Sequence, residues 1–300
     1  MYLMDGTDDT PKMVVYLNTD TLVDLVEQTV WSGGNMDTAL ERLRLDGFDG
    51  VQVGGAHELY NSDIMPFCGL DRVNLPRETD AIFKQHIQRG DKCISLHVGW
   101  GMESDREMDA LVESVLNASE KYRLPAFIET HRATITQDMW RTVELTKRYP
   151  EVRFNGDFSH WYCGQEMVYG NFESKLNFLQ PVFDRIGFMH GRIASPGNMQ
   201  APIESSNVRP LNAVGKADYL VDFKVLWKRA MAGFRNNAPR GSVLVFAPEI
   251  LSHYHYYARM VSGPDGVLKE ENDRYAQALL YGEIAKDCFA ECLTSSGAPS

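Results

Sequence analysis

The chain has 300 residues, 44% of them hydrophobic and 24% charged, which is enough for one large α/β domain or two smaller ones. Its formal net charge of -11 and the lack of any Lys/Arg run argue against a nucleic-acid-binding surface, because phosphate binding needs clustered cations. The five cysteines are odd in number and form no CxxC pair, so neither a disulfide scaffold nor a zinc finger is predicted.

The N-terminal sequence MYLMDGTDDT lacks the basic start and apolar run of a secretory signal. No apolar stretch approaches the roughly 18 residues that a membrane-spanning helix needs. We therefore expect a cytoplasmic protein that has no membrane or nucleic-acid partner. Residues 1–12 are expected to form a flexible lead.

Short apolar runs bounded by turn residues predict strands along the whole chain. The first strand is either 13–17 or 27–31, and the pattern does not separate these two choices. Further strands are predicted within 47–53, 93–99, 126–128, 152–154, 186–192 and 242–249. Residues 54–77 are expected to be irregular, because they are rich in turn formers.

Apolar residues at helical spacing predict helices between these strands. The predicted helices are 36–45 with Asn35 as its cap, 78–88, 104–122, a segment containing Met139, Val143 and Tyr149, 173–185, 219–234 and 272–292. Residues 194–215 contain Pro196, Pro202 and Pro210 and have no steady periodicity. Because long loops in compact domains are usually functional, this segment is predicted to lie over the mouth of the domain.

The alternation of strands and helices predicts a single-domain (β/α)₈ (TIM) barrel. Six or seven strands can be recognised, so one or two strands of a complete barrel remain unplaced. A doubly wound sheet is the alternative, but no glycine-rich nucleotide-binding turn follows an early strand.

Acidic or imidazole side chains end four of the predicted strands: Glu129, Asp157, His190 and Glu249. Because parallel strands present their carboxyl ends on one rim of a barrel, these side chains are expected to meet there. Three carboxylates and one imidazole form a hard ligand set that suits Mn²⁺ or Mg²⁺ and tolerates Co²⁺ or Zn²⁺. Such a set leaves room for two substrate oxygens, as chelation of a hydroxy-ketone requires.

Further groups at the same rim suit proton transfer. Glu129 and His131 alternate along one strand and therefore share a face, so His131 is a candidate general base beside the ligand cluster. Glu129 and Glu249 are candidate proton carriers on the two faces of a bound sugar. His97, in another predicted strand, is a candidate substrate contact.

The order of these motifs resembles the xylose-isomerase-like superfamily. The motifs are E-x-H at 129–131, D-F-S-H-W at 157–161, H-x-R at 190–192 and the strand-ending Glu249, and the resemblance covers about residues 47–250. That superfamily of TIM barrels includes sugar isomerases, ketose 3-epimerases, inosose dehydratases and AP endonucleases. The resemblance implies one divalent ion, with Mn²⁺ first, held by Glu129, Asp157, His190 and Glu249. It also implies that His160 and Arg192 contact the substrate. Gln52 is a departure, because Glu is common at this position in the superfamily.

The leading functional prediction is a metal-dependent isomerase or epimerase of a sugar or polyol that removes a proton alpha to a carbonyl. The alternative is a metal-dependent lyase acting on 3-keto glycosides or inososes, similar to C-glycoside deglycosidases, with His131 as base. Two remoter alternatives are an AP endonuclease, whose Asp-x-His pair is missing between His190 and Glu249, and a non-catalytic sugar-binding barrel. The expected partners are a carbohydrate substrate and either further copies of the chain, through the aromatic cluster 253–257, or a small partner subunit.

Overall fold

Eight parallel strands form the centre of the molecule. The computed structural model describes residues 1–27, 29–33, 36–54, 63–203 and 219–294. The strands are β2 (Lys12–Asn18), β3 (Gly50–Gly54), β4 (Phe67–Val73), β5 (Ile94–Val98), β6 (Ala126–Glu129), β7 (Phe154–Asn155), β8 (Ile186–Gly191) and β9 (Ser242–Pro248). Each strand pairs in parallel with the next, and β9 also pairs in parallel with β2. The sheet is therefore closed, and the predicted single-domain TIM barrel is confirmed.

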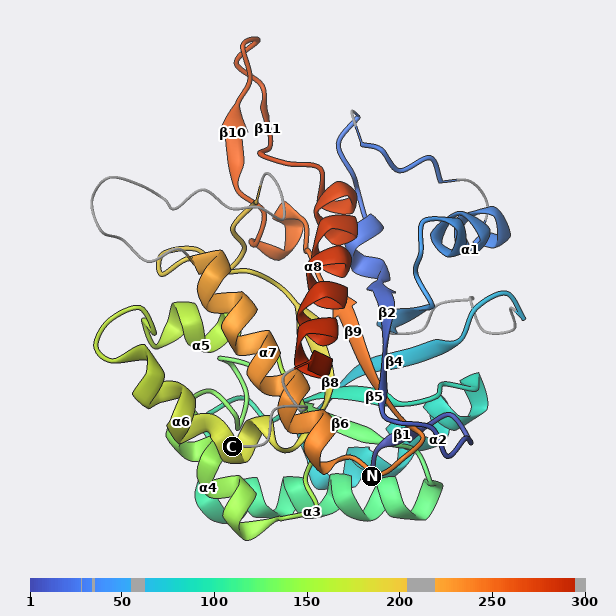
Figure 1. The fold of residues 1–300 in the computed structure, drawn as a ribbon, viewed down its shortest axis with the longest axis vertical. Coiled ribbons are helices and arrows are strands. Elements are labelled where there is room, and N and C mark those ends of the chain that lie inside the picture. The colour runs from blue at the N-terminus through green and yellow to red at the C-terminus, as the bar shows by residue number, and fades with distance from the viewer. Residues whose placement is uncertain (28, 34–35, 55–62, 204–218, 295–300) are drawn as a thin grey trace.

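Helices surround these strands (Figure 1). They are α1 (Met36–Leu45), α2 (Thr79–Arg89), α3 (Asp105–Tyr122), α4 (Met139–Arg148), α5 (Ser159–Gly164), α6 (Phe172–Phe183), α7 (Tyr219–Asn237) and α8 (Arg274–Thr294), with short 3₁₀ turns η1 (Thr19–Leu22), η2 (Pro76–Glu78) and η3 (His253–His255). Helix α3 shows why such segments are helical. Ser104 caps it and Glu107 completes a capping box, while its apolar side chains lie buried against the barrel.

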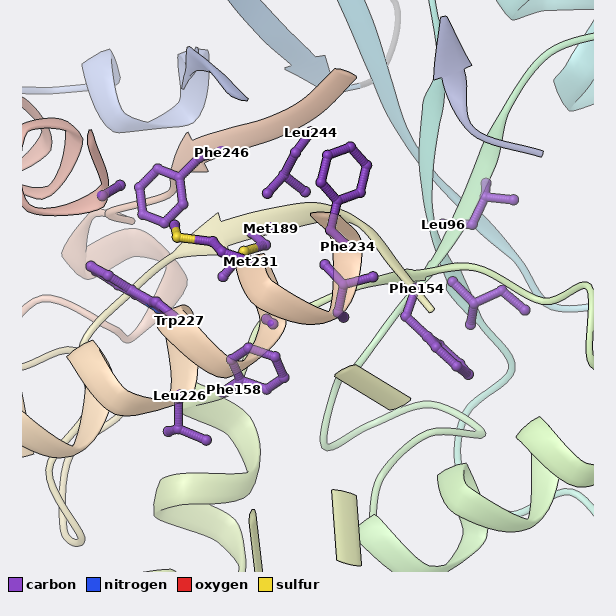
Figure 2. Close-up of a cluster of buried hydrophobic side chains, with 14 of the residues drawn as sticks. Leu96, Phe154, Phe158, Met189, Leu226, Trp227, Met231, Phe234, Leu244 and Phe246 are labelled. Atoms are coloured by element: carbon purple, nitrogen blue, oxygen red, sulfur yellow. The ribbon is translucent and has the colours of Figure 1, made fainter. Parts of the chain in front are cut away.

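The main hydrophobic core lies between the outer face of the strands and the helices. Figure 2 shows Trp227 and Met231 of α7 beside Met189 of β8 and Phe246 of β9. The rings of Trp227 and Phe246 meet edge to face, with their centroids 4.9 Å apart. Because successive strand residues point to opposite faces, each residue packed on the helices leaves its neighbours facing the barrel interior.

The barrel interior has an apolar floor. Its buried members are Tyr16, Cys68, Cys93, Phe127, Phe188, Val245 and Ala247. Further along the same inward-facing rows, toward the carboxyl ends of the strands, the side chains become polar, as in Asn18, Gln52 and Glu129, which are all buried. The inward-facing polar side chains therefore lie above the apolar floor.

The structure corrects the prediction for residues 54–77. Residues 67–73 form β4, which pairs with both β3 and β5. Its sequence, FCGLDRV, has a glycine and two charged residues and no clean alternation, so its strand conformation depends on pairing with two distant segments. The described residues contain no helix between β3 and β4, and this departs from the simple alternation that guided the prediction.

The N-terminal predictions have mixed outcomes. The segment 13–17 lies in β2, whereas the described residues of 27–31 form no strand. Residues 1–12, expected to be a flexible lead, contain the short strand β1 (Leu3–Met4), which pairs antiparallel with β9. Asn35 and most of the predicted 194–215 loop lie outside the described residues.

A small hairpin, which the sequence analysis missed, follows β9. Its strands are β10 (Met260–Ser262) and β11 (Leu268–Glu270), and it projects from the body of the barrel at the top of Figure 1. The aromatic cluster 253–257 precedes it and includes η3, and Tyr254 and Tyr256 are exposed there. None of the helices in the described part of the chain is both long and apolar enough to span a bilayer.

A buried charge cluster links α2 to the strands. The imidazole of His86 is fully buried, with Nδ1 2.5 Å from Asp91 Oδ2 and Nε2 3.3 Å from Asp71 Oδ2. Burial lowers the pKa of His86, but the hydrogen bonds with Asp71 and Asp91 outweigh it and leave the pKa raised. Burial raises the pKa of Asp71, but the bond from His86 outweighs it and leaves that pKa lowered.

The stabilisation from this cluster is expected to depend on pH. The contribution of His86 is complete below its unfolded pKa of about 6.5 and is lost as the pH rises through its raised folded pKa. The contribution of Asp71 is complete above about pH 4 and is lost as the pH falls through its lowered folded pKa. We expect His86→Gln to reduce the free energy of unfolding in urea more at about pH 6 than above about pH 9. His255→Gln, at an exposed position, is the control. An equal cost of His86→Gln at both pH values would contradict the prediction.

Candidate metal and substrate site

Four strands bring one group of acidic and imidazole side chains together. Glu129 ends β6, His190 lies in β8, Asp157 comes two residues after the end of β7, and Glu249 directly follows β9. Each offers one ligand atom, and these atoms all lie within 4.8 Å of one another. All four residues are buried. This cluster could hold a metal ion, as the sequence analysis predicted from the same four residues.

The orientation of His190 in β8 is fixed by a side chain of β3, which lies three strands away around the barrel. Its Nε2 lies 2.8 Å from Oε1 of Gln52, and the same oxygen accepts a hydrogen bond from Asn18 Nδ2 at 3.0 Å. The Gln52 oxygen can only accept, so Nε2 of His190 must carry the proton. In the neutral ring Nδ1 then carries no proton, and it faces the carboxylates of Glu129 and Glu249, each at 3.4 Å.

Hydrogen bonds also fix the carboxylates. Asn18 Nδ2 donates to Oε1 of Glu249 at 3.0 Å, and Arg192 binds the other oxygen of Glu249 through Nη2 and its main-chain carbonyl through Nε. Asp157 accepts hydrogen bonds from the main chain and hydroxyl of Ser159 through Oδ1. Its other oxygen, Oδ2, lies 3.4 Å from Arg192 Nη2. Arg192 therefore sits between two carboxylates that approach from different strands.

Several buried ligand atoms of the cluster have no hydrogen-bond partner within the described residues. They are Oε1 of Glu129, Oδ2 of Asp157 and Nδ1 of His190. A buried polar atom without a partner is costly, and a metal ion bound within the cluster would supply that partner. The residues present therefore fit a divalent cation with oxygen-rich ligands.

The surroundings act differently on the carboxyl groups of Glu129 and Asp157. Burial by itself raises the pKa of Glu129, but the His97 and His190 rings outweigh it and hold that pKa well below its usual range. Burial raises the pKa of Asp157, and the Arg192 guanidinium offsets only part of the increase.

Three imidazoles form a row along one side of the cluster. The ring centroid of His131 lies 4.4 Å from that of His97 and 3.8 Å from that of His160. His97 Nε2 lies 3.1 Å from Oε2 of Glu129, which connects the row to the cluster. Burial, reinforced by His97, lowers the pKa of His131 to about 2. Burial and then His131 lower the pKa of His160 well below its usual range.

The hydrogen bond of His131 limits what its ring can do. Nδ1 accepts the main-chain N–H of Ala133 at 3.1 Å, so the neutral ring carries its proton on Nε2. The main-chain N–H of His131 is bound by Thr136, whose hydroxyl also donates to the carbonyl of Glu129. The 129–136 loop therefore holds His131 as a hydrogen-bond donor, whereas both ring nitrogens of His160 have no partner within the described residues.

All the predicted site residues lie in this one region. They are Glu129, His131, Glu249, His97, His160, Arg192, Asp157 and His190. A second group that could hold a metal ion, His97, Glu129 and His131, shares Glu129 with the first. The sequence analysis missed the supporting side chains Asn18, Ser95 and Asn155, of which Ser95 and Asn155 contact Oε2 of Glu129. Their inward-facing places in strands were the only available signal.

Comparisons with known proteins bear on the fold. No protein-family model matches the sequence, and no curated protein matches it. The probable 3-DHS dehydratase AsbF of Bacillus anthracis, involved in petrobactin synthesis, is 15% identical, with 81% of this chain and 94% of that chain covered and a TM-score of 0.52. A sugar phosphate isomerase/epimerase from Parabacteroides distasonis is 12% identical, with 91% and 96% covered and a TM-score of 0.50.

A third solved structure, a xylose isomerase domain protein from Planctomyces limnophilus, is 15% identical, with 96% of this chain and 97% of that chain covered and a TM-score of 0.47. These structural neighbours are xylose-isomerase-like TIM barrels. At such low identity the likeness of the first two shows the fold alone. The predicted resemblance to the xylose-isomerase-like superfamily is therefore confirmed for the fold.

Metal binding is expected to stabilise the protein, because a cation offsets the repulsion among three buried carboxylates. We expect the purified chain to retain about one divalent ion and its melting temperature to rise on addition of Mn²⁺. Asp157→Asn should lose both properties, yet without metal it should melt no lower than the wild type, because it removes one repelling charge. Elemental analysis and thermal melting measure these effects, with Glu283→Gln on exposed α8 surface as the control. Full metal retention by Asp157→Asn would contradict the assignment.

The bond from His190 to Gln52 is expected to tune metal affinity without supplying a ligand. Loss of such a supporting bond typically lowers affinity about 10–100-fold. We expect Gln52→Ala to weaken Mn²⁺ binding by about this factor and Gln52→Glu, which keeps the acceptor, to restore it. Calorimetric titration of the metal-free proteins measures both. Wild-type affinity in Gln52→Ala would show that His190 is oriented by other contacts.

Proposed function

We propose that the protein is a divalent-metal-dependent isomerase or epimerase of a sugar or polyol, acting by removal of a proton alpha to a carbonyl. The observation that carries the proposal is the placement of unpartnered ligand atoms on Glu129, Asp157 and His190 beside a row of imidazoles. Glu249 completes the ligand set. Its oxygen-rich character favours Mn²⁺, with Mg²⁺, Co²⁺ or Zn²⁺ as substitutes.

A divalent ion held there would polarise the substrate carbonyl and stabilise the negative charge that develops when the proton leaves. Glu129 and Glu249 come from β6 and β9, three strands apart around the barrel, so their carboxylates approach a substrate from different directions. We assign them as proton carriers as well as ligands. A proton removed on one face and returned on the other changes the configuration of the carbon without changing the mass.

The neighbouring side chains bind and orient the substrate. In the neutral ring His131 carries Nε2–H, which can donate to a substrate oxygen, including one on which negative charge develops. The Nη1 of Arg192 and the ring nitrogens of His160 have no partner within the described residues, so they are available to substrate hydroxyl groups. His97 holds Glu129 in place and lines the same side.

One observation favours lyase chemistry as a second candidate. Elimination on one face of a sugar needs a group that takes a proton and another that gives one to the leaving group. His131 and His160 lie with ring centroids 3.8 Å apart on one side of the cluster, and His131 is already held as a donor. A 3-keto glycoside or an inosose would suit this arrangement.

Proton abstraction predicts solvent exchange. The Mn²⁺-loaded protein, incubated in D₂O with ketoses and 3-keto glycosides, is expected to place deuterium at a carbon alpha to the carbonyl, as measured by NMR and mass spectrometry. Products of unchanged formula, apart from deuterium, indicate isomerisation or epimerisation, and loss of water or of an aglycone indicates elimination. Glu129→Gln should reduce exchange by about 10²–10⁴-fold, whereas Glu283→Gln should not. A metal-loaded wild type that exchanges no alpha proton in any substrate contradicts the proposal.

A further inference from the structure

Two arginines lie at the mouth of the site. Within the described residues, neither Arg72 nor Arg132 lies in an ion pair, although the chain as a whole carries a net charge of -11. Neither residue has a role in the reaction proposed above. Both are nevertheless held beside the row of imidazoles, one at each end.

Arg72 is held at the end nearest His97. It lies on β4 directly opposite His97 of β5, so the two side chains point to the same face of the barrel. Nη2 lies 3.4 Å from His97 Nδ1, Nη1 donates to the carbonyl of Gly99 at 2.8 Å, and the guanidinium lies 4.2 Å from the centre of the Trp100 ring. Only His97 separates Arg72 from the metal-ligand cluster.

The loop that carries Trp100 is rigidly built. Gly99 has a φ of +68°, and a Cβ there would lie 2.7–2.8 Å from Glu103 and Ile135. The Glu103 carboxylate accepts the main-chain N–H of Trp100 at 2.7 Å and that of Gly101 at 2.8 Å. The loop thereby fixes both the aromatic ring and the carbonyl that orient Arg72.

Arg132 stands near the other end of the row, where His160 lies. Its guanidinium lies 5.6 Å from the centre of the Tyr257 ring, and Arg192 lies 4.5 Å from the same ring. Tyr257 also meets His160 edge on, with ring centroids 6.5 Å apart. Each end of the imidazole row therefore carries an arginine stacked on an aromatic ring.

Charge balance shows that these two arginines are surplus to the site itself. Glu129, Asp157 and Glu249 carry three negative charges, and a divalent ion together with Arg192 balances them. The charges of Arg72 and Arg132 remain, and neither guanidinium forms an ion pair within the described residues. A planar guanidinium with free N–H groups binds carboxylate or phosphate oxygens through short, charge-assisted hydrogen bonds.

We propose that the substrate is anionic: a polyhydroxylated carbonyl compound with a carboxylate or a phosphate ester that Arg72 binds and Arg132 attracts at the rim. This inference rests on the proposed function, because it takes the metal cluster as the place where the carbonyl binds. It adds a specificity group that lies outside the ligand set. A keto acid of a sugar or a ketose phosphate has the required chemistry.

The test compares three probes that share one carbon skeleton: D-fructose, D-fructuronate and D-fructose 6-phosphate. Their binding to the Mn²⁺-loaded protein is measured by isothermal titration calorimetry. Hydrogen bonds to a charged group contribute about 1.5–3 kcal/mol, which corresponds to about 10–100-fold in Kd. We expect at least one anionic probe to bind tighter than D-fructose by about this factor, and the tighter of the two identifies carboxylate or phosphate as the group.

Variants separate Arg72 from other sources of attraction. Arg72→Gln should weaken binding of the anionic probe much more than binding of D-fructose and so remove the preference, and Arg72→Lys should retain part of the preference because the charge remains. Arg132→Gln should weaken the same preference to a smaller extent. Arg123→Gln, exposed in the turn that leads into β6 at the opposite end of the barrel, is the control of equal charge. Thermal melting checks that each variant is folded.

Two outcomes overturn the proposal. One is equal affinity for all three probes, including no binding of any of them. The other is a preference for anions that persists in Arg72→Gln, which would place the attraction on the metal ion or on another group. Metal content and deuterium exchange are measured separately from binding. If no deuterium is exchanged but the preference for the anionic probe still depends on Arg72, the proposed reaction fails and this inference does not.

Discussion

The convergence of three buried carboxylates on one point is the constraint on which the rest of the site depends. Glu129, Asp157 and Glu249 are almost completely buried, and their ligand atoms lie within 4.8 Å of one another and of His190. At this separation and an effective dielectric constant of about 20, each pair of like charges repels by about 3 kcal/mol. One arginine, Arg192, reaches two of the carboxylates. The remaining imbalance is the physical reason to expect a cation.

The barrel tolerates this arrangement because its closed sheet holds the ligands rigidly. Each ligand comes from a strand end whose neighbours are paired on both sides, and the row below it is an apolar floor that excludes water. Side chains from other strands then restrict the ligands: Gln52 sets the protonated nitrogen of His190, and Asn18 binds Glu249. A site of this kind is organised before any substrate arrives, which is what electrostatic catalysis requires.

The chemistry proposed for the site follows from the different charges of the ligand cluster, the imidazole row and the arginines at the rim. The ligand cluster is acidic, burial lowers the pKa values of His131 and His160 beside it, and the guanidinium groups of Arg72 and Arg132 lie over the rings of Trp100 and Tyr257 at the rim. Carbonyl polarisation, donation of hydrogen bonds and recognition of an anion are thus assigned to three separate layers. The substrate class and the reaction can therefore be tested independently of each other.

The sequence by itself determined the barrel and the eight polar residues of the proposed site. The barrel and six of these residues follow from local signals, namely apolar strands that end in acid or imidazole groups, because parallel strands must present those ends on one rim. His160 and Arg192 were expected from the family resemblance. The sequence analysis missed β4, and with it the place of Arg72, because that strand has a weak pattern and is held by pairing with β3 and β5. Only the tertiary structure decided which atoms lack partners, which nitrogen of His131 and His190 carries the proton, and which arginines are unpaired. These properties depend on distances between residues remote in the chain, and no local pattern encodes them.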